Sequence, residues 1–341
     1  MKRILLVNFH ESPENFHFER AFLRALAVRG GLFADIVHDF ENDYSFIGAG
    51  LPPGARRFKC EGLAWLKNTI RRPYELVVML DFPKRSRSSS GFFWLLREAP
   101  AAKKIFIANH LIPMPGQSLT ADLVRRIRAL DRVDTGYMLE SDDASLWGET
   151  GLSGRRLLKR GYASDCVFYK PSRARRRNYI FSAGSAGRNF GALAAGAGLA
   201  GLGLTVFSDS PGGLPAWVDF RPLSQNIQNL RAAASGAAAV VVPVSDGYLN
   251  EAAGNSIAFL GMALGRPVLA RRTRYMERFI RDGVNGFFYD RLTPGAITAG
   301  LKRITAYSPE RLRKLGANAR RTVLARANLD KFCAAFLLRH S

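Results

Sequence analysis

The sequence is poor in cysteine and lacks the spacings that mark metal and disulfide proteins. Its 341 residues include only Cys60, Cys166 and Cys333, which lie far apart, with no second Cys or His at metal-ligand spacing. These features argue against a disulfide framework and a zinc site, so we predict a cytoplasmic protein without a metal site. The apolar run at residues 4–7 is too short for a signal peptide.

Long hydrophobic runs are also missing. The least charged stretch, residues 189–209, is interrupted by glycines and ends in a strand-like Leu-Thr-Val-Phe, so it predicts a buried helix and strand rather than a membrane span. No strand is followed by Gly-x-Gly-x-x-Gly with an acidic residue about 20 positions later, which argues against a nicotinamide oxidoreductase.

Acidic residues are few relative to basic ones. The chain has 50 Lys and Arg against 28 Asp and Glu, a formal net charge of +22 spread over both halves. Such a field attracts polyanions, so we expect either an anionic membrane surface or nucleic acid as a partner. Arginine-rich composition from coding bias is the alternative explanation. The 47% hydrophobic content excludes a disordered chain, and the length predicts two domains.

Short apolar runs alternate with helical patterns along the first half. Residues 3–8, 33–38, 74–81 and 104–110 predict strands, and residues 18–28 predict a helix. This alternation is typical of βαβ units with a parallel sheet, in which ligands bind at the loops after the carboxyl ends of the strands. The loops of interest therefore begin near Asn8, Asp81 and Asn109.

The alternation resumes after a strongly basic stretch at residues 170–178. Strands are predicted at residues 179–182, 204–207, 238–243 and 267–270, and helices follow several of them. We therefore predict an α/β protein with two Rossmann-like βαβ domains that face each other across a cleft. The expected parts are residues 1–170, a basic linker at 171–178, a second domain at 179–315, and a helical region at 316–341 that packs back on the first domain.

Two loops in the second half have the composition of phosphate-binding turns. In the first, Gly184, Ser185 and Arg188 lie between a strand and a helix, where backbone N–H groups and an arginine can bind an anion. In the second, Glu251 precedes a Gly254-Asn255-Ser256 helix start, which suits a diphosphate, while the carboxylate suits sugar hydroxyls. A plain tight turn and a simple helix cap are the alternative interpretations.

These loops and the segment after them resemble the carboxyl domain of nucleotide-sugar glycosyltransferases with the GT-B fold. The run Met262-Ala263, Gly265, Pro267-Val268 and the turn Asp282-Gly-x-Asn-Gly286 match the large retaining group in order and spacing. The resemblance covers residues 179–290 firmly and the first half only thinly. It implies a transferase with a retaining outcome that needs no metal ion, has no permanently bound cofactor and uses a UDP- or GDP-sugar as donor.

The resemblance also implies roles for individual residues. Glu251 would bind the donor sugar, and Arg188 would contact the donor diphosphate with Gly184, Ser185, Gly254, Asn255 and Ser256. His110, at a strand end, would lie beside the reacting carbon. His10 and Glu11 in the first loop, with Asp81 after a later strand, are candidates on the acceptor side. A surface or capping role is the alternative for each of these residues.

Two departures from the family pattern concern the donor site. A second Glu usually follows the first by eight residues and binds the donor ribose, but Phe259 or Leu260 stands there. Ser185 also stands where an arginine is common. A degenerate, non-catalytic GT-B-like binding protein is therefore a second hypothesis.

Arginines are concentrated after the second phosphate loop. The stretch contains Arg266, Arg271, Arg272, Arg274, Arg278 and Arg281, interleaved with Tyr275 and Phe279. We expect at least one of these arginines to lie near a donor phosphate and the two aromatic side chains to pack in the core.

The charge leaves two acceptor hypotheses. One is a lipid-linked or envelope glycan on an anionic surface, reached by a cytoplasmic protein at the inner face of the membrane. The other is a modified base in DNA.

Overall fold

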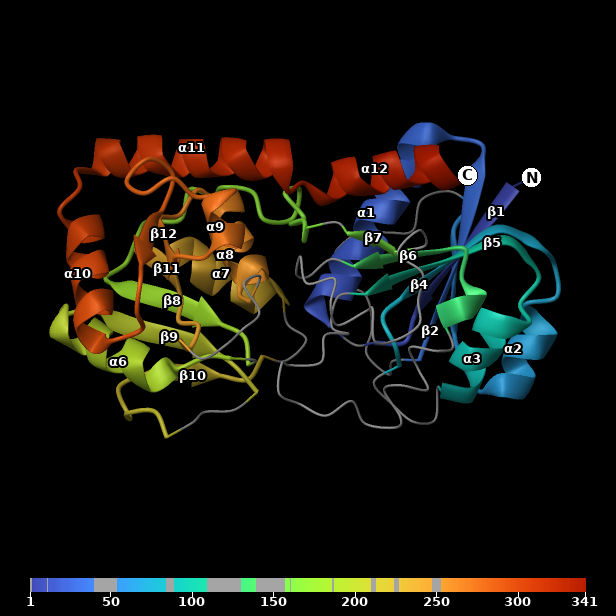
Figure 1. Cartoon of the computed structure of the whole chain (residues 1–341), viewed down its shortest axis with the longest axis horizontal. Helices are drawn as coiled ribbons and strands as arrows, with labels where there is room; N and C mark the ends of the chain where they lie inside the picture. The colour runs from blue at the N-terminus through green and yellow to red at the C-terminus, as the bar shows by residue number, and fades with distance from the viewer. Residues whose placement is uncertain are drawn as a thin grey trace. The chain divides into compact units, whose positions relative to one another are not determined.

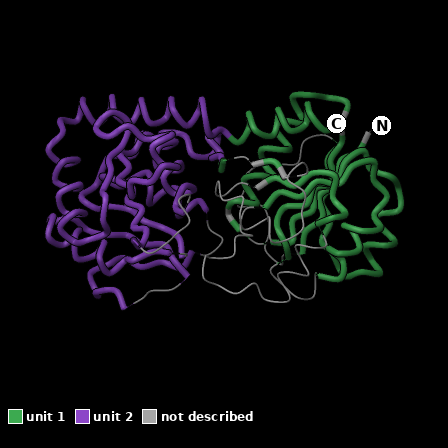
Figure 2. The backbone as a smooth tube through the Cα atoms, viewed as in Figure 1, with its two compact units in different colours: residues 1–162, 329–341 green, residues 163–328 purple. Residues whose placement is uncertain are grey.

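The computed structural model is an α/β protein with two compact units (Figure 1). It describes residues 2–10, 12–39, 54–83, 89–108, 130–138, 157–159, 161–185, 187–209, 213–223, 227–246 and 253–341. Unit 1 comprises residues 1–162 and 329–341, and unit 2 comprises residues 163–328 (Figure 2).

Unit 1 is built on a seven-stranded parallel sheet with the order β3-β2-β1-β4-β5-β6-β7. The strands are β1 (Lys2–Asn8), β2 (Leu32–His38), β3 (Arg56–Lys59), β4 (Tyr74–Leu80), β5 (Ala101–Ala108), β6 (Thr135–Met138) and β7 (Leu157–Lys159). Its described helices are α1 (Pro13–Arg29), α2 (Leu63–Thr69), α3 (Ser89–Arg97), α12 (Leu329–His340) and the short η3 (Leu130–Arg132).

Local sequence explains why α1 begins and ends where it does. The Ser12 side chain accepts a hydrogen bond from the backbone N–H of Asn15 and caps the first turn. Gly30 ends the helix with a φ of 67°, and its N–H donates to the carbonyl of Leu26. The helix therefore starts five residues before the predicted one at 18–28.

Unit 2 is built on a six-stranded parallel sheet with the order β10-β9-β8-β11-β12-β13. The strands are β8 (Tyr179–Ala183), β9 (Gly203–Phe207), β10 (Asp219–Arg221), β11 (Ala239–Val242), β12 (Val268–Arg271) and β13 (Phe287–Tyr289). Its described helices are α6 (Phe190–Leu199), α7 (Ile227–Gly236), α8 (Asn255–Ala263), α9 (Arg274–Glu277), α10 (Pro294–Thr305) and α11 (Pro309–Arg326).

The weakly charged stretch at residues 189–209 forms α6 and β9, the buried helix and strand that the sequence predicts. Its glycines allow close packing, since a Cβ on Gly196 would lie 2.7 Å from side-chain atoms of Ile297 in α10. None of the helices that the structure describes combines the length and the apolar composition needed to cross a bilayer.

The chain returns to unit 1 through its last helix. Phe332 and Phe336 of α12 pack edge-on against Phe18 and Phe22 of α1, with ring centroids 5.7 Å and 5.1 Å apart. Arg24 of α1 also pairs with Asp330 at 2.6 Å. Residues 316–328, which we expected to belong to the same returning region, instead lie in unit 2, where residues 316–326 complete α11.

The basic stretch at residues 171–178 lies inside unit 2, which begins at Ala163. The backbone N–H of Arg177 donates to the carbonyl of Gly236, and Arg266 donates to the carbonyl of Ala174. These bonds attach the stretch to α7 and to the segment before β12.

The strand order reverses once in each sheet. In unit 1 the reversal lies between β1 and β4, and in unit 2 it lies between β8 and β11. At such a point the loops after two adjacent parallel strands diverge to opposite sides, which leaves a crevice at the carboxyl edge of the sheet. The fold thus defines one candidate binding position in each unit.

A buried carboxylate at the opposite edge holds the first strands of unit 1 together. Asp35 in β2 accepts hydrogen bonds from Arg3 of β1, Arg56 of β3 and the hydroxyl of Tyr74 in β4. Burial raises the pKa of Asp35, but the bonds from Arg56, Arg3 and Tyr74 outweigh that effect and lower the pKa to about 2.

We therefore expect Asp35 to make the stability of unit 1 sensitive to acid. Because its pKa is lower in the folded chain, its contribution is present above pH of about 4 and is lost as the pH falls towards about 2, a loss of about 2 kcal/mol. Denaturant unfolding across this range should show that loss in the wild type and not in Asp35→Asn. Glu61→Gln, at an exposed carboxylate of the same unit, controls for removal of one charge. Equal acid sensitivity of wild type and Asp35→Asn would contradict the prediction.

Candidate functional site

The crevice of unit 2 is formed by the loops after β8 and β11, the two loops that the sequence singles out. Gly184 follows β8 with a φ of 107°, and Gly254 precedes α8 with a φ of 83°. Both values lie in the left-handed region, which disfavours residues with a Cβ. Each glycine lets the backbone turn sharply at the edge of the sheet.

Arg188 joins these two loops. Its Nη2 atom lies 3.0 Å from the position that a Cβ on Gly184 would occupy and 3.3 Å from that of a Cβ on Gly254. Its Nε also donates to the carbonyl of Ala183 at 3.3 Å. The guanidinium is thus held between two glycines, where a Cβ on either one would crowd it.

Backbone hydrogen bonds fix the two loops to each other. The N–H of Asn189 donates to the carbonyl of Pro243 at 3.0 Å, and the N–H of Ser245 donates to the carbonyl of Gly187 at 2.9 Å. Arg188 and Val244 form the antiparallel bridge between these bonds. The position of the Arg188 backbone relative to the start of the loop after β11 is therefore set by the main chain.

The helix that begins at this crevice has polar groups without partners. No side chain caps α8, whose N-cap is Gly254. Asn255 is only 2% exposed, and its Nδ2 has no hydrogen-bond partner in the part of the chain that the structure describes. Free N–H groups at a helix start are suited to an anion, and a buried amide without a partner is costly in a ligand-free protein.

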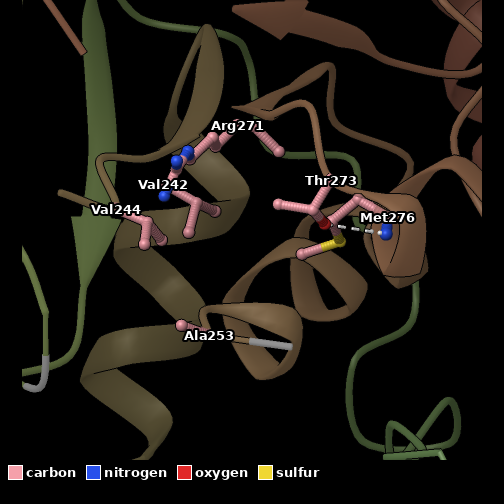
Figure 3. A pocket seen from close by; sticks show the side chains of 7 residues that line it. Val242, Val244, Ala253, Arg271, Thr273 and Met276 are labelled. Atoms are coloured by element: carbon pink, nitrogen blue, oxygen red, sulfur yellow. Dashed lines mark hydrogen bonds between the residues drawn. The ribbon is translucent and has the colours of Figure 1, made fainter. Parts of the chain in front are cut away.

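A second arginine lies at the end of β12. Arg271 donates to the backbone carbonyls of Ser245 and Asp246, both at 2.9 Å, in the loop after β11. It lines a small cavity of about 10 Å³ in which Val242 and Val244 lie across from Thr273 and Met276 (Figure 3). Arg271 was one of six arginines in the basic stretch, and sequence alone does not separate it from the others.

Tyr289 of β13 supports the same loop and was not identified from the sequence. Its hydroxyl donates to the carbonyl of Val242 at 2.7 Å and accepts from the N–H of Val244 at 2.9 Å. Burial raises the pKa of Tyr289, so the hydroxyl stays protonated, while Arg188 and Arg271 oppose the rise. No motif marks this residue, because its role depends on the pairing of β12 with β13.

Other residues of the predicted donor set lie in different surroundings. The Ser185 hydroxyl is 3.3 Å from a carboxylate oxygen of Asp209 and accepts from the N–H of Asp209, so it links this loop to the one after β9. Ser256 lies in the first turn of α8, where it is half-buried. Phe259 and Leu260 are 0% and 3% exposed, and Phe259 packs against Phe279 with ring centroids 4.6 Å apart.

The remaining arginines of the basic stretch are separated by the fold. Arg266 precedes β12 and therefore lies at the opposite edge of the sheet from Arg271. Arg272 pairs with Asp290 and Glu277. Tyr275 and Phe279 are buried, as expected for core residues.

In unit 1 the crevice lies between the loops after β1 and β4. The side chain of Asn15 donates towards Asn8 Oδ1 and the carbonyls of His10 and Leu80, each at 3.3 Å, and so links the two loops. Asp81 follows β4 and is 1% exposed, with a φ of 56°, the one positive φ among the described residues other than glycine. Such a conformation is unusual for a residue with a Cβ.

The acceptor-side candidates His10 and Asp81 thus lie at the switch point of unit 1. Neither the polar contacts of Asn15 nor its burial is marked by a sequence motif. Glu11, His110 and Glu251 lie outside the described residues.

Comparison with known proteins identifies the fold. No protein-family model and no curated protein sequence matches the chain. Among solved structures, sucrose-phosphate synthase from Thermosynechococcus elongatus is similar over 99% of this chain and 98% of its own, with a TM-score of 0.71 and 16% identity. Anabaena HepE in complex with UDP-glucose is similar over 99% and 100%, with a TM-score of 0.69 and 12% identity.

A variant of TarM from S. aureus is also similar, over 99% of both chains, with a TM-score of 0.66 and 9% identity. These neighbours are GT-B glycosyltransferases, and the likeness extends over nearly the whole chain. The chain therefore has the GT-B fold, as the sequence predicts.

The close approach at Gly254 gives a test of the crevice geometry. A Cβ there would lie 2.1 Å from Cγ1 of Val242, in addition to the strain of the positive φ. We expect Gly254→Ala to lower the free energy of unfolding by about 2–4 kcal/mol, measured by denaturant titration. Gly213→Ala is the matched control, because its φ is 67° but its Cβ would meet nothing within 4 Å. The Val242→Ala change should recover part of the loss in the double variant, and similar losses for the two glycine variants would show that the contact with Val242 is unimportant.

Proposed function

We propose that the protein is a glycosyltransferase that moves a hexosyl or related group from a nucleoside diphosphate sugar to an acceptor. The observation that carries the proposal is Arg188, held between Gly184 and Gly254 at the switch point of unit 2. A diphosphate placed there would meet a guanidinium, the uncapped start of α8 and the unpaired amide of Asn255. These groups match the charge and hydrogen-bonding capacity of a phosphate anion.

The same groups would assist departure of the nucleotide. Negative charge grows on the diphosphate as the sugar leaves, and fixed donors that stabilise this charge lower the barrier. Arg188 would supply the positive charge that a metal ion supplies in other sites, so we propose a reaction without metal. With a retaining outcome, no protein base would be required. Glu251 would bind the donor sugar and His110 would lie beside the reacting carbon.

The chain lacks the second Glu that usually binds the donor ribose in similar transferases, so a different group would have to bind the ribose here. Phe259 and Leu260, which stand at that position, are buried in the core and have no polar atom to offer. This observation favours the second candidate function, a GT-B-like protein that binds a nucleotide without transferring a sugar. The two functions differ in turnover and not in binding.

The neighbours favour a uridine nucleotide over guanosine. Anabaena HepE has been solved with UDP and with UDP-glucose, and S. aureus TarM with UDP. We therefore propose a UDP-sugar as donor, with a GDP-sugar as the other possibility to be tested.

The first prediction of this proposal concerns donor binding. We expect one of the UDP-, GDP-, ADP- or TDP-sugars to raise the melting temperature of the wild type, because a ligand that binds only the folded state stabilises it. Arg188→Ala should raise the dissociation constant of that nucleotide sugar about tenfold or more, since the change removes a charged hydrogen-bond donor. Arg281→Ala, at an exposed arginine of the same unit, should change the constant little.

The outcomes separate the hypotheses. Stabilisation with release of free sugar or transfer to an acceptor supports the transferase. Stabilisation without turnover supports the binding protein. If none of the four nucleotide sugars stabilises the wild type, neither hypothesis is tenable.

For the acceptor, we propose a lipid-linked or envelope glycan at an anionic surface. His10, Glu11 and Asp81 would face it from the switch point of unit 1, and the +22 charge would draw a cytoplasmic protein to the inner face of the membrane. A modified base in DNA is the competing acceptor, and the two require different anions.

The second prediction concerns this choice. The protein should cosediment with phosphatidylcholine vesicles only when they contain phosphatidylglycerol, and salt should reverse the association because exposed charges are screened. Tighter binding to duplex DNA than to these vesicles, in the same buffer, would favour the DNA acceptor. Binding to neither anion would show that the net charge does not select the acceptor.

A further inference from the structure

A second basic recess lies at the other edge of the sheet of unit 2. It has a volume of about 510 Å³ and is lined by the segment before β8, the turn between α8 and β12, and the first turns of α11. The arginines that line it are Arg173, Arg176, Arg266, Arg313 and Arg320, and none of the described residues in its lining is acidic. Arg266 and Arg271 lie at opposite ends of β12, so this recess is distinct from the crevice that contains Arg188.

Main-chain contacts form the floor of the recess. Gly265, with a φ of 67°, ends α8 directly against α11, where a Cβ on Gly316 would lie 2.1 Å from the carbonyl oxygen of Gly265. Arg320 donates to the carbonyls of Cys166, Tyr169 and Ala263, which ties α11 to the floor. The recess is therefore built by main-chain contacts and not by mobile side chains alone.

Nothing in the described part of the chain neutralises these arginines. Arg266 is only 6% exposed and donates to the carbonyl of Ala174, and Arg176 donates to the carbonyl of Leu312 at 3.5 Å. Both partners are uncharged. Burial and the neighbouring Arg176 lower the pKa of Arg266 to about 10, and burial and Arg313 lower that of Arg176. The arginines thus repel one another, and a bound anion would relieve this repulsion.

Two of the arginines remain available for a ligand. Arg173 and Arg313 are exposed and make no hydrogen bond or ion pair among the described residues. They reach the recess from the 171–178 segment and from α11, respectively. Pro309, in the first turn of the 18-residue helix α11, also lines the recess.

We propose that this recess binds a phosphate-bearing anion, such as a diphosphate or the headgroup of an anionic phospholipid. Guanidinium groups are suited to such a ligand because they donate paired hydrogen bonds to phosphate oxygens. The volume of about 510 Å³ is sufficient for a headgroup or a small phosphate ester, whereas a nucleic acid duplex would need an extended surface. This site is independent of the proposed transferase activity.

Pyrophosphate is the probe for the first test. Wild-type protein is treated with phenylglyoxal, which modifies exposed arginines, and each site is quantified by peptide mass spectrometry with and without pyrophosphate. Arg173 and Arg313 should be protected, while Arg175, exposed in the same segment but outside the recess, should not. Equal modification of all three residues with and without the probe would contradict binding of a soluble diphosphate.

Matched double variants give the second test. Arg173→Ala with Arg313→Ala removes the two available arginines, whereas Arg175→Ala with Lys314→Ala removes the same charge from the same two segments outside the recess. Both pairs are made in an Arg188→Ala background, so that pyrophosphate bound in the donor crevice does not contribute. The first pair should then weaken binding of pyrophosphate, or of phosphatidylglycerol vesicles, about tenfold or more, and the second pair should have a much smaller effect. Equal weakening by both pairs would show that net charge alone attracts the anion and would overturn the site.

A soluble phosphate ligand and a lipid headgroup are distinguished by which of the two probes, pyrophosphate or vesicles, loses affinity in the Arg173→Ala, Arg313→Ala protein. Loss of pyrophosphate binding indicates a soluble ligand, and loss of vesicle binding alone indicates a lipid headgroup. Stabilisation by a nucleotide sugar should persist in the Arg173→Ala, Arg313→Ala protein that retains Arg188, because Arg173 and Arg313 lie outside the donor crevice. The outcome for this recess is therefore separate from that for Arg188.

Discussion

The pairing of β8 with β11 is the contact on which the candidate site depends. Ile180 and Phe181 lie opposite Ala239 and Val240 in parallel register, although α6, β9, β10 and α7 separate them in the chain. The pairing brings two glycine turns to one edge of the sheet, and the main-chain bonds between the loops then determine where Arg188 can lie. Unit 1 repeats this arrangement with β1 and β4, where the amide of Asn15 links the loops.

Sequence predicts the buried strands well and the edge strands poorly, for a physical reason. Buried parallel strands such as β1 and β4 are continuous apolar runs, because both faces of the sheet are covered. In contrast, β3 (Arg56–Lys59) has three basic residues in four and is a strand because it pairs with β2 and because Arg56 reaches Asp35. The glycine turns could be predicted from their spacing. The contact of Arg188 with both turns, and the support from Tyr289, depend on tertiary structure and could not.

The absence of the usual second Glu has a structural counterpart in α8. Most of this helix is buried, and Gly261 lies so close to the sheet that a Cβ would approach Val240 and Val268 to 2.9 Å. A carboxylate at Phe259 or Leu260 would have to be placed in this apolar layer, where an unpaired charge is strongly unfavourable. An apolar residue in place of the usual Glu is therefore consistent with the packing of α8. The ribose of any donor would have to be bound by residues outside this helix.

The surplus of positive charge is divided among positions with different physical consequences. Arg56 and Arg272 are paired with carboxylates, so they contribute little to the external field of the protein. Arg188 and Arg271 are bonded to backbone carbonyls at the carboxyl edge of the second sheet. Arg173 and Arg313, at the other edge, have neither kind of partner among the described residues. Because guanidinium charge left without a counterion favours anion binding, the two edges of this one sheet are suited to separate anions, and net charge alone does not distinguish them.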